Sequence, residues 1–282
     1  MRRAERISLS TLADESHLIR VKEIGPKFVE LITHPALLDK AKDVESALKS
    51  TGITAGTLHG PTGPDTDIAR PDPKGREKAL RLHEEYLRLS ESLGDKYYVI
   101  HPGIDVYLDQ VGGRWDDAKK VIKFERNEGE LARLWRINAE SLAFLGDFAS
   151  KLKVKIALET GPTNLITISE TLKIIEGAGR DNIGVCVDAG HVNVGGVVRP
   201  EDAIREAGEL LWALHLHDNN GEGDSHLPPG EGSMDWPRVV RALEDVSYRG
   251  TYNVELAYLD WKTDGAWKKA KESVSFLTAV LG

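Results

Sequence analysis

Histidine and acidic residues stand where several short apolar runs of the sequence end. These residues are His59, His101, Glu159, Asp188, His215 and Glu255. Imidazole nitrogens and carboxylate oxygens are ligands that suit zinc and manganese, and the set contains no thiolate that would favour a softer metal. Such side chains are costly to bury without partners, and a divalent cation would partner all of them. The sequence therefore predicts a metal site that is built from strand ends.

The alternation of apolar and polar residues along these runs supports the same site. Successive side chains of a strand point to opposite sides, so in VKIALE (154–159) the apolar residues would face outward and Glu159 inward. The same rule turns inward the side chains that end three later runs, Asp188, His215 and Glu255. We predict that these four residues bind one divalent cation, with Glu159 and Glu255 also acting as catalytic groups.

Two loops add further residues of metal-binding type. His191 follows Asp188 in VDAGH, and Asp224 and His226 flank a serine in GDSHLPPGEG. With His59 and His101, they raise the number of predicted ligands to nine. We expect one to three ions of zinc or manganese.

The remaining histidines and one inward glutamate have other predicted roles. By the same alternation, Glu30 faces inward in FVELI (28–32), where it would contact substrate, orient a ligand or form a buried ion pair. His217 is predicted to contact substrate or to support a ligand, because Asp218 continues the polar cluster. His17, His34 and His83 are expected at the surface.

These residues must be held by elements that repeat along the chain. Short β-branched runs alternate with longer amphipathic stretches such as 77–93, 128–152 and 265–281, and Thr167 or Ser169 could cap a further helix. Eight runs are candidate strands: 7–11, 28–32, 54–59, 97–101, 154–159, 183–188, 211–217 and 252–257. This arithmetic predicts an α/β fold, a single-domain (β/α)8 TIM barrel over residues 1–282, with catalytic groups at the carboxyl ends of the strands. A doubly wound sheet would usually carry a glycine-rich phosphate turn after an early strand, which is missing here.

Composition narrows the class of protein. The chain has 282 residues, a formal net charge of -8 and one cysteine, Cys186. A disulfide within the chain is excluded, which suggests a reducing compartment. The acidic balance argues mildly against a general nucleic-acid binder. No stretch approaches the roughly 18 apolar residues of a membrane span, and MRRAERISLST has no apolar signal-peptide region. We expect a soluble, cytoplasmic protein without a membrane partner; a homo-oligomer is compatible with the sequence.

Seven motifs resemble the xylose-isomerase-like barrel superfamily, which holds sugar and sugar-phosphate isomerases and epimerases together with endonuclease IV-like enzymes. They are LHG (58–60), HPG (101–103), ALET (157–160), VCVDAGH (185–191), HLHDN (215–219), DSHLPPGEGSMDW (224–236) and VELAY (254–258). Similarity to the isomerases implies the four-residue metal site. Similarity to the endonucleases implies three zinc ions, held by His59, His101 and Glu159, by Asp188, His215 and Glu255, and by His191, Asp224 and His226.

The resemblance leaves two activities open. As an isomerase or epimerase of a sugar or sugar phosphate, the protein would transfer protons through a metal-stabilised enediolate. Glu159 and Glu255 would lie on opposite sides of the substrate. The predicted substrate contacts are Glu30, His217 and Trp236. The alternative is an endonuclease IV-like, zinc-dependent phosphodiesterase that acts on abasic-site DNA. The loop GPTGPDTDIARPD is acidic and lacks the aromatic wedge expected of such a nuclease. A metal-binding protein without turnover is a third class.

Overall fold

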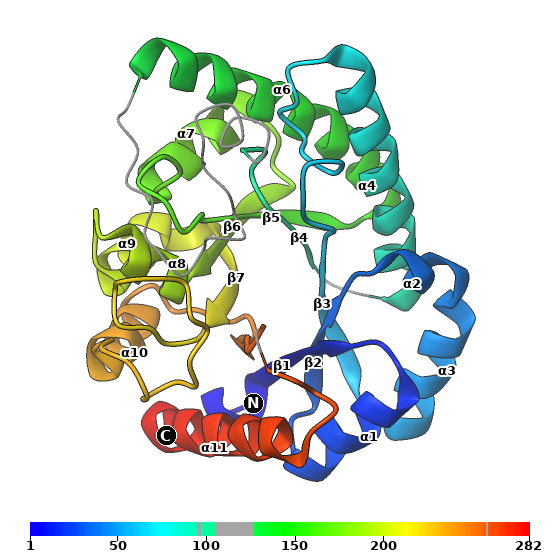
Figure 1. The fold of residues 1–282 in the computed structure, drawn as a ribbon, viewed down its shortest axis with the longest axis vertical. Coiled ribbons are helices and arrows are strands. Elements are labelled where there is room, and N and C mark those ends of the chain that lie inside the picture. The colour runs from blue at the N-terminus through cyan, green and yellow to red at the C-terminus, as the bar shows by residue number, and fades with distance from the viewer. Residues whose placement is uncertain (95–96, 105–126, 258) are drawn as a thin grey trace.

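The computed structural model of the chain describes residues 1–94, 97–104, 127–257 and 259–282. Its strands are all parallel, and each pairs with the next along the chain until the last pairs with the first, which closes a barrel (Figure 1). The predicted (β/α)8 TIM barrel is confirmed. The strands are β1 (Ile7–Leu12), β2 (Phe28–Ile32), β3 (Thr54–His59), β4 (Tyr97–Ile100), β5 (Lys155–Glu159), β6 (Ile183–Asp188), β7 (Leu211–Leu216) and β8 (Tyr252–Val254).

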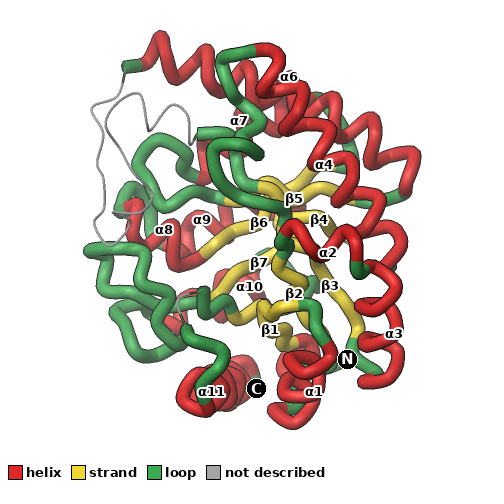
Figure 2. Tube along the Cα trace, turned by 45° about the vertical axis from the view of Figure 1, so that its right-hand side comes forward, coloured by secondary structure: helices red, strands yellow, loops and turns green. Residues whose placement is uncertain are grey.

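Helices enclose the barrel on its outer side (Figure 2). They are α1 (Glu15–Ile24), α2 (Pro35–Asp39), α3 (Ala41–Thr51), α4 (Pro73–Leu93), α6 (Glu128–Leu152), α7 (Ile168–Ala178), α8 (Ala189–Gly195), α9 (Pro200–Ala207), α10 (Trp236–Asp245) and α11 (Asp264–Leu281), with short 3-10 turns η1 (Arg3–Arg6) and η3 (Gly208–Leu210). The last helix, α11, packs against α1 and η1, so the two ends of the chain meet beside the closing strands (Figure 1).

Local capping explains where the helices begin. Of the two caps considered from the sequence, Thr167 is the one present, and it forms a reciprocal capping box with Glu170 at the start of α7. The helix α4 begins at Pro73 rather than at residue 77, because the Asp72 side chain accepts a hydrogen bond from the Gly75 amide and proline suits the first turn.

The alternation of side chains divides the interior into two apolar layers. Val99, Ala157, Cys186 and Ala213 form a small cluster inside the barrel. Their outward neighbours on the same strands, Ile156 and Val187 among them, belong to the larger core between strands and helices. The predicted directions of the side chains along β5 and β6 are therefore confirmed, and small residues fill the barrel beneath its polar mouth.

Three strands end earlier than the sequence predicts. β4 ends at Ile100, β7 at Leu216 and β8 at Val254, so His101, His217 and Glu255 lie just beyond the ladder. β8 pairs with only three residues of β1 and two of β7. The Glu255 amide still donates to the Leu216 carbonyl at 3.2 Å, which keeps its backbone beside β7.

The expectation that His83 lies at the surface is wrong. This side chain of α4 is 1% exposed, and its ring bonds the Tyr98 hydroxyl and the Thr66 carbonyl. His17 is also partly covered, because its ring packs against Trp267. Among the described residues no helix combines the length and apolar character that crossing a bilayer requires.

Candidate metal centre

The four residues predicted to share one cation meet at the mouth of the barrel around the His215 ring. His215 Nδ1 lies 3.1 Å from Glu255 Oε2, 3.3 Å from Glu159 Oε1 and 3.6 Å from Asp188 Oδ2. All four are buried, and one ligand atom from each lies within 4.8 Å of the others. We call Glu159, Asp188, His215 and Glu255 the inner group. It combines side chains from β5, β6 and β7 with the residue that follows β8.

Glu30 of β2 lies beneath the inner group and holds its histidine. His215 Nε2 donates to Glu30 Oε2 at 2.9 Å, which turns Nδ1 toward the other carboxylates. Ser10, Thr57 and Asn253 donate three further hydrogen bonds to the Glu30 carboxylate. Of the roles considered for Glu30, the structure therefore favours that of a residue that orients a ligand.

A second group shares Glu159 with the inner group. Glu159 Oε2 lies 3.1 Å from His101 Nε2 and 3.4 Å from His59 Nε2, whereas Glu159 Oε1 faces His215. His59 ends β3, and His101, at 32% exposure of its side chain, is the most open of the predicted ligands. The two oxygens of Glu159 thus face different groups of ligands.

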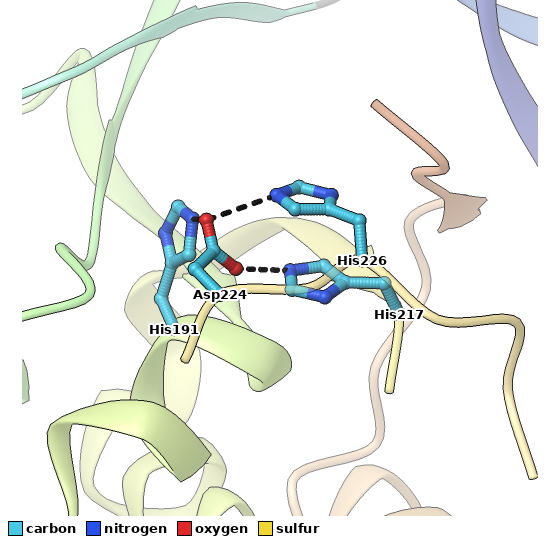
Figure 3. Close-up of side chains that lie close together, drawn as sticks. All are labelled: His191, His217, Asp224 and His226. Carbon is cyan, nitrogen blue, oxygen red and sulfur yellow. Dashed lines mark hydrogen bonds and ion pairs between the residues drawn. The ribbon is translucent and has the colours of Figure 1, made fainter. Parts of the chain in front are cut away.

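An outer group of side chains comes from the loops after β6 and β7. His191 on α8, His217, Asp224 and His226 point toward one another, with Asp224 among the three rings (Figure 3). Asp224 Oδ2 lies 3.1 Å from His226 Nε2 and 3.4 Å from His191 Nε2, and Asp224 Oδ1 lies 3.7 Å from His217 Nε2. The structure thus brings together all nine residues predicted as ligands, and His217 lies beside them.

Backbone carbonyls set the tautomers of three of these rings. The Nδ1 atoms of His59, His191 and His226 contact the carbonyl oxygens of residues 60, 160 and 255, at 2.8, 2.9 and 3.2 Å. A carbonyl only accepts, so each Nδ1 carries a proton, and the Nε2 of the neutral ring presents a lone pair. Each of these Nε2 atoms faces a carboxylate oxygen, and a cation between such atoms removes their repulsion.

The electrostatics of the site favour positive charge among ionised carboxylates. Burial opposes charge on His59, but the hydrogen bond and negative charge of Glu159 outweigh it and raise the pKa of His59 to about 9. For Glu159, burial opposes ionisation, yet His101 and His215 hold its pKa well below the ordinary value. The pKa of Glu255 falls to about 2 because His215 likewise outweighs burial. These carboxylates are therefore ionised at neutral pH.

The residues present fit a divalent cation. Glu159 Oε2, Glu255 Oε2 and Asp224 Oδ1 are buried oxygens that have no hydrogen-bond partner within the described part of the chain. Ligand atoms that share one tetrahedral zinc at about 2.0–2.2 Å lie about 3.3–3.6 Å apart. The distances from His215 Nδ1 to the three carboxylates, 3.1–3.6 Å, are close to that spacing. The donor set of imidazoles and carboxylates suits zinc or manganese.

The loop that carries Asp224 and His226 is held by Asp218. Its carboxylate accepts hydrogen bonds from the amides of residues 230 and 234 and from the Trp236 indole at 2.8 Å. Trp236 is 4% exposed and packs against Phe276 in the helix layer. This placement differs from the substrate contact predicted for Trp236, since its indole N–H already has a partner inside the fold.

One member of the outer group, His217, and one residue that makes room for it, Gly190, were not predicted from the sequence. His217 was expected to contact substrate or to support a ligand, although it shares the inward side of its strand with His215, two residues before it. Gly190 makes room for its ring: a Cβ at this glycine would stand 2.0 Å from His217 Cε1. The alternation rule could have identified His217 as a ligand candidate, whereas the role of Gly190 depends on tertiary contact.

Comparisons with known proteins agree with this architecture. The family model described as xylose isomerase-like TIM barrel matches residues 18–280. An uncharacterized protein of Methanocaldococcus jannaschii is 30% identical over 54% of this chain and 56% of its own. A D-psicose 3-epimerase of Enterocloster bolteae is 31% identical over 36% of this chain and 32% of its own. The chain thus matches about half or less of the length of these relatives.

Solved structures share the fold across almost the whole chain. A D-tagatose 3-epimerase-like protein superposes with a TM-score of 0.78 at 19% identity and covers 98% of this chain and 97% of its own. The IolI protein with a bound zinc atom has a TM-score of 0.73 at 18% identity and covers 97% and 98%. At these identities the likeness concerns the fold.

Proposed function

Because the chain belongs to the xylose isomerase-like TIM barrel family, we propose that it is a divalent-metal-dependent isomerase or epimerase of a sugar or sugar phosphate. The observation that carries the proposal is the pair of buried carboxylates on the same imidazole: Glu159 and Glu255 both lie within 3.3 Å of His215 Nδ1. Glu159 ends β5 and Glu255 follows β8, three strands further around the barrel. The relative named D-psicose 3-epimerase supports a ketose as substrate.

Glu159, Asp188, His215 and Glu255 would hold the cation, and zinc or manganese suits them. When bound, the cation would lower the pKa of the carbon next to a ketose carbonyl and stabilise negative charge on the substrate oxygens. Zinc in the similarly folded IolI protein supports this choice of cation class.

The chain's own carboxylates would move the proton. Both are ionised at neutral pH, so one accepts the proton from the carbon while the other, after protonation by solvent, returns a proton on the opposite face. Glu30 keeps the His215 ring in the orientation that aims Nδ1 at the inner group. The small residues of the inner barrel cluster close the floor of the site against water.

Deuterium exchange tests the proposal directly. In D2O, the wild-type protein loaded with manganese should incorporate deuterium at the carbon beside the carbonyl of a ketose such as psicose or tagatose. Glu159→Gln and Glu255→Gln should each lower this exchange by about 100-fold or more, because general acid–base catalysis contributes about 10²–10⁴-fold. Glu176→Gln, an exposed glutamate of α7, is the matched control. Exchange that survives both substitutions would rule out the assignment.

A second candidate function rests on the ligands outside the inner group. The group around His59 and His101 and the outer group exceed what one cation needs, and endonuclease IV-like phosphodiesterases use a three-zinc site. When bound, clustered zinc ions lower the pKa of water and stabilise the oxygens of a phosphodiester. Nicking of abasic-site DNA at a stated salt concentration, together with about three zinc ions per chain, would favour this function. Exchange into ketoses without nicking would favour the isomerase.

A further inference from the structure

His217 gives the outer group a ligand set of its own. We propose that His191, His217, Asp224 and His226 form a closed cation site, separate from the inner group, in which His217 is the fourth protein ligand. Three imidazoles and one carboxylate suit a zinc-class divalent cation. The proposal concerns cation binding only, so it stands or falls independently of the proposed activity.

The positions of the ligand atoms support four-fold coordination. His191 and His226 each place an Nε2 atom within 3.4 Å of Asp224 Oδ2, while His217 Nε2 faces the other oxygen, Oδ1, at 3.7 Å. One ligand atom from each of the four lies within 4.8 Å of all the others, and all four residues are buried (Figure 3).

An unpartnered oxygen points independently to a ligand. Asp224 is 6% exposed, and its Oδ1 atom has no hydrogen-bond partner in the described part of the structure. A buried carboxylate oxygen without a partner is costly. The nearest ring, His217, is stacked on His226 with centroids 3.7 Å apart and planes 10° apart. The two rings therefore lie side by side, and both of their Nε2 atoms face the Asp224 carboxylate.

The competing role for His217 is to position Asp188. His217 Nε2 lies 2.9 Å from Asp188 Oδ1 and is hydrogen-bonded to Asp188 Oδ2 at 3.2 Å, and this role requires the ring to keep that bond when a cation is bound. In that case His217 would support the inner group and contribute nothing to the outer one. The substitution His217→Gln separates the two roles. The glutamine side-chain NH2 can replace the imidazole as a hydrogen-bond donor to Asp188, whereas the amide is a poor ligand for zinc.

A closed site has a consequence for the substrate. Zinc with four protein ligands is typical of structural sites, which keep no position for a substrate oxygen. An outer cation with His217 bound would therefore hold the loop of Asp224 and His226 against α8 rather than contact a phosphate group. Removal of His217 should open that position to inorganic phosphate.

The test measures the number of cations bound by the 282-residue chain and their coordination geometry. The wild-type chain, stripped with chelator and titrated with Co²⁺, should show the intense visible absorption of a tetrahedral site. His217→Gln should bind one cation fewer, or bind it more than about 100-fold more weakly, since losing a supporting residue alone costs about 10–100-fold. Glu255→Gln should leave this absorption in place, because it removes only an inner ligand. Any weakly bound Co²⁺ that remains in His217→Gln should gain a phosphate-dependent spectral change.

Ser225→Ala serves as the matched control, since this exposed residue lies between Asp224 and His226. It should keep the stoichiometry and the spectrum of the wild type. Far-UV circular dichroism checks that each variant is folded, and zinc X-ray absorption of the wild-type protein gives the number of imidazoles per ion without any substitution. His217→Gln with unchanged stoichiometry and spectrum, or fewer than three imidazoles on every ion, would overturn the proposal.

Discussion

At the scale of single residues, hydrogen bonds behind each imidazole decide which nitrogen faces the site. Carbonyl oxygens take the Nδ1–H of His59, His191 and His226, whereas the Glu30 carboxylate takes the Nε2–H of His215. The first three rings therefore present Nε2, and His215 presents Nδ1. These partners orient the ligands before any cation arrives, which lowers the ordering cost of binding.

Glu30→Gln tests this orientation. The amide can keep some of the hydrogen bonds from Ser10, Thr57 and Asn253 but no longer offers a charged acceptor to His215. We expect cation affinity at the inner group to fall by about 10–100-fold. Competition with a chromophoric chelator measures the change, with Glu176→Gln as control. Unaltered affinity would mean that the His215 ring keeps its orientation without Glu30.

Gly190→Ala tests the close contact under His217. A Cβ at residue 190 would overlap the His217 ring, so the substitution must move the ring or α8. We expect the free energy of unfolding to fall by about 1–3 kcal/mol, the usual cost of overpacking, with weaker cation binding by the outer group. Gly265→Ala, where the new methyl group would meet only Thr263 Oγ1 at 3.8 Å, should be neutral or slightly stabilising. Urea unfolding measures the free energy of unfolding of both variants and of the wild type. A Gly190→Ala variant as stable as the wild type would contradict the predicted overlap with the His217 ring.

At the scale of elements, one buried histidine joins α4 to the barrel. His83 Nε2 donates to the Thr66 carbonyl at 2.9 Å, and its Nδ1 accepts from the Tyr98 hydroxyl of β4 at 2.6 Å. This arrangement requires the neutral ring. Burial is the main reason that the pKa of His83 falls from 6.5 to about 4.

The low pKa of His83 predicts a specific loss of stability in acid. Between pH 6.5 and about 4 the unfolded chain binds a proton at this residue and the folded chain does not, so stability decreases as the pH falls through this window and the loss is complete below about 4. Relative to His83→Gln, the wild-type free energy of unfolding should decline by about 3 kcal/mol across the window. Urea unfolding at several pH values measures the difference. A difference that is independent of pH would show that the folded protein accommodates the charged ring.

At the scale of the whole molecule, the site draws on most of the strands that close the barrel. The inner and outer groups join β5, β6, β7 and the residue after β8, while Glu30 adds β2 and His59 adds β3. A cation that binds only this assembled arrangement stabilises the folded barrel by mass action. The same carboxylates repel one another when no positive charge lies among them.

Removal of the cation should therefore destabilise the entire fold. With zinc at 100 times its dissociation constant, the folded state gains about 2.7 kcal/mol, which chelation should abolish as a lower Tm. Differential scanning calorimetry with and without EDTA measures the shift. In Glu159→Gln the shift should be much smaller, because Glu159 serves two groups of ligands. Identical wild-type Tm values in zinc and in EDTA would speak against a cation bound by the native barrel.

Much of the fold follows from the sequence because strand and helix signals are local. Alternation along 154–159 and 183–188 gave the correct inward side chains, since it depends only on the two-residue repeat of a strand. Strand ends were predicted less accurately. β8 stops at Val254 and pairs with three residues of β1 and two of β7, and this pairing is not visible in its own residues. His83 was misplaced for a similar reason, as its partners Thr66 and Tyr98 are distant in sequence.

For the site, strand parity determined the inward direction of Glu159, Asp188, His215 and Glu255. Residue type and position along the chain added the other five predicted ligands. Only the tertiary structure decided how they divide into groups, that Glu30 serves His215, that Trp236 bonds Asp218 within the helix layer and that His217 joins Asp224. The physical reason is that the two kinds of information act over different separations along the chain. Side-chain direction is set by backbone geometry within one strand, whereas a shared cation depends on distances of a few ångströms between residues on different strands and loops, and those distances exist only once the barrel has closed.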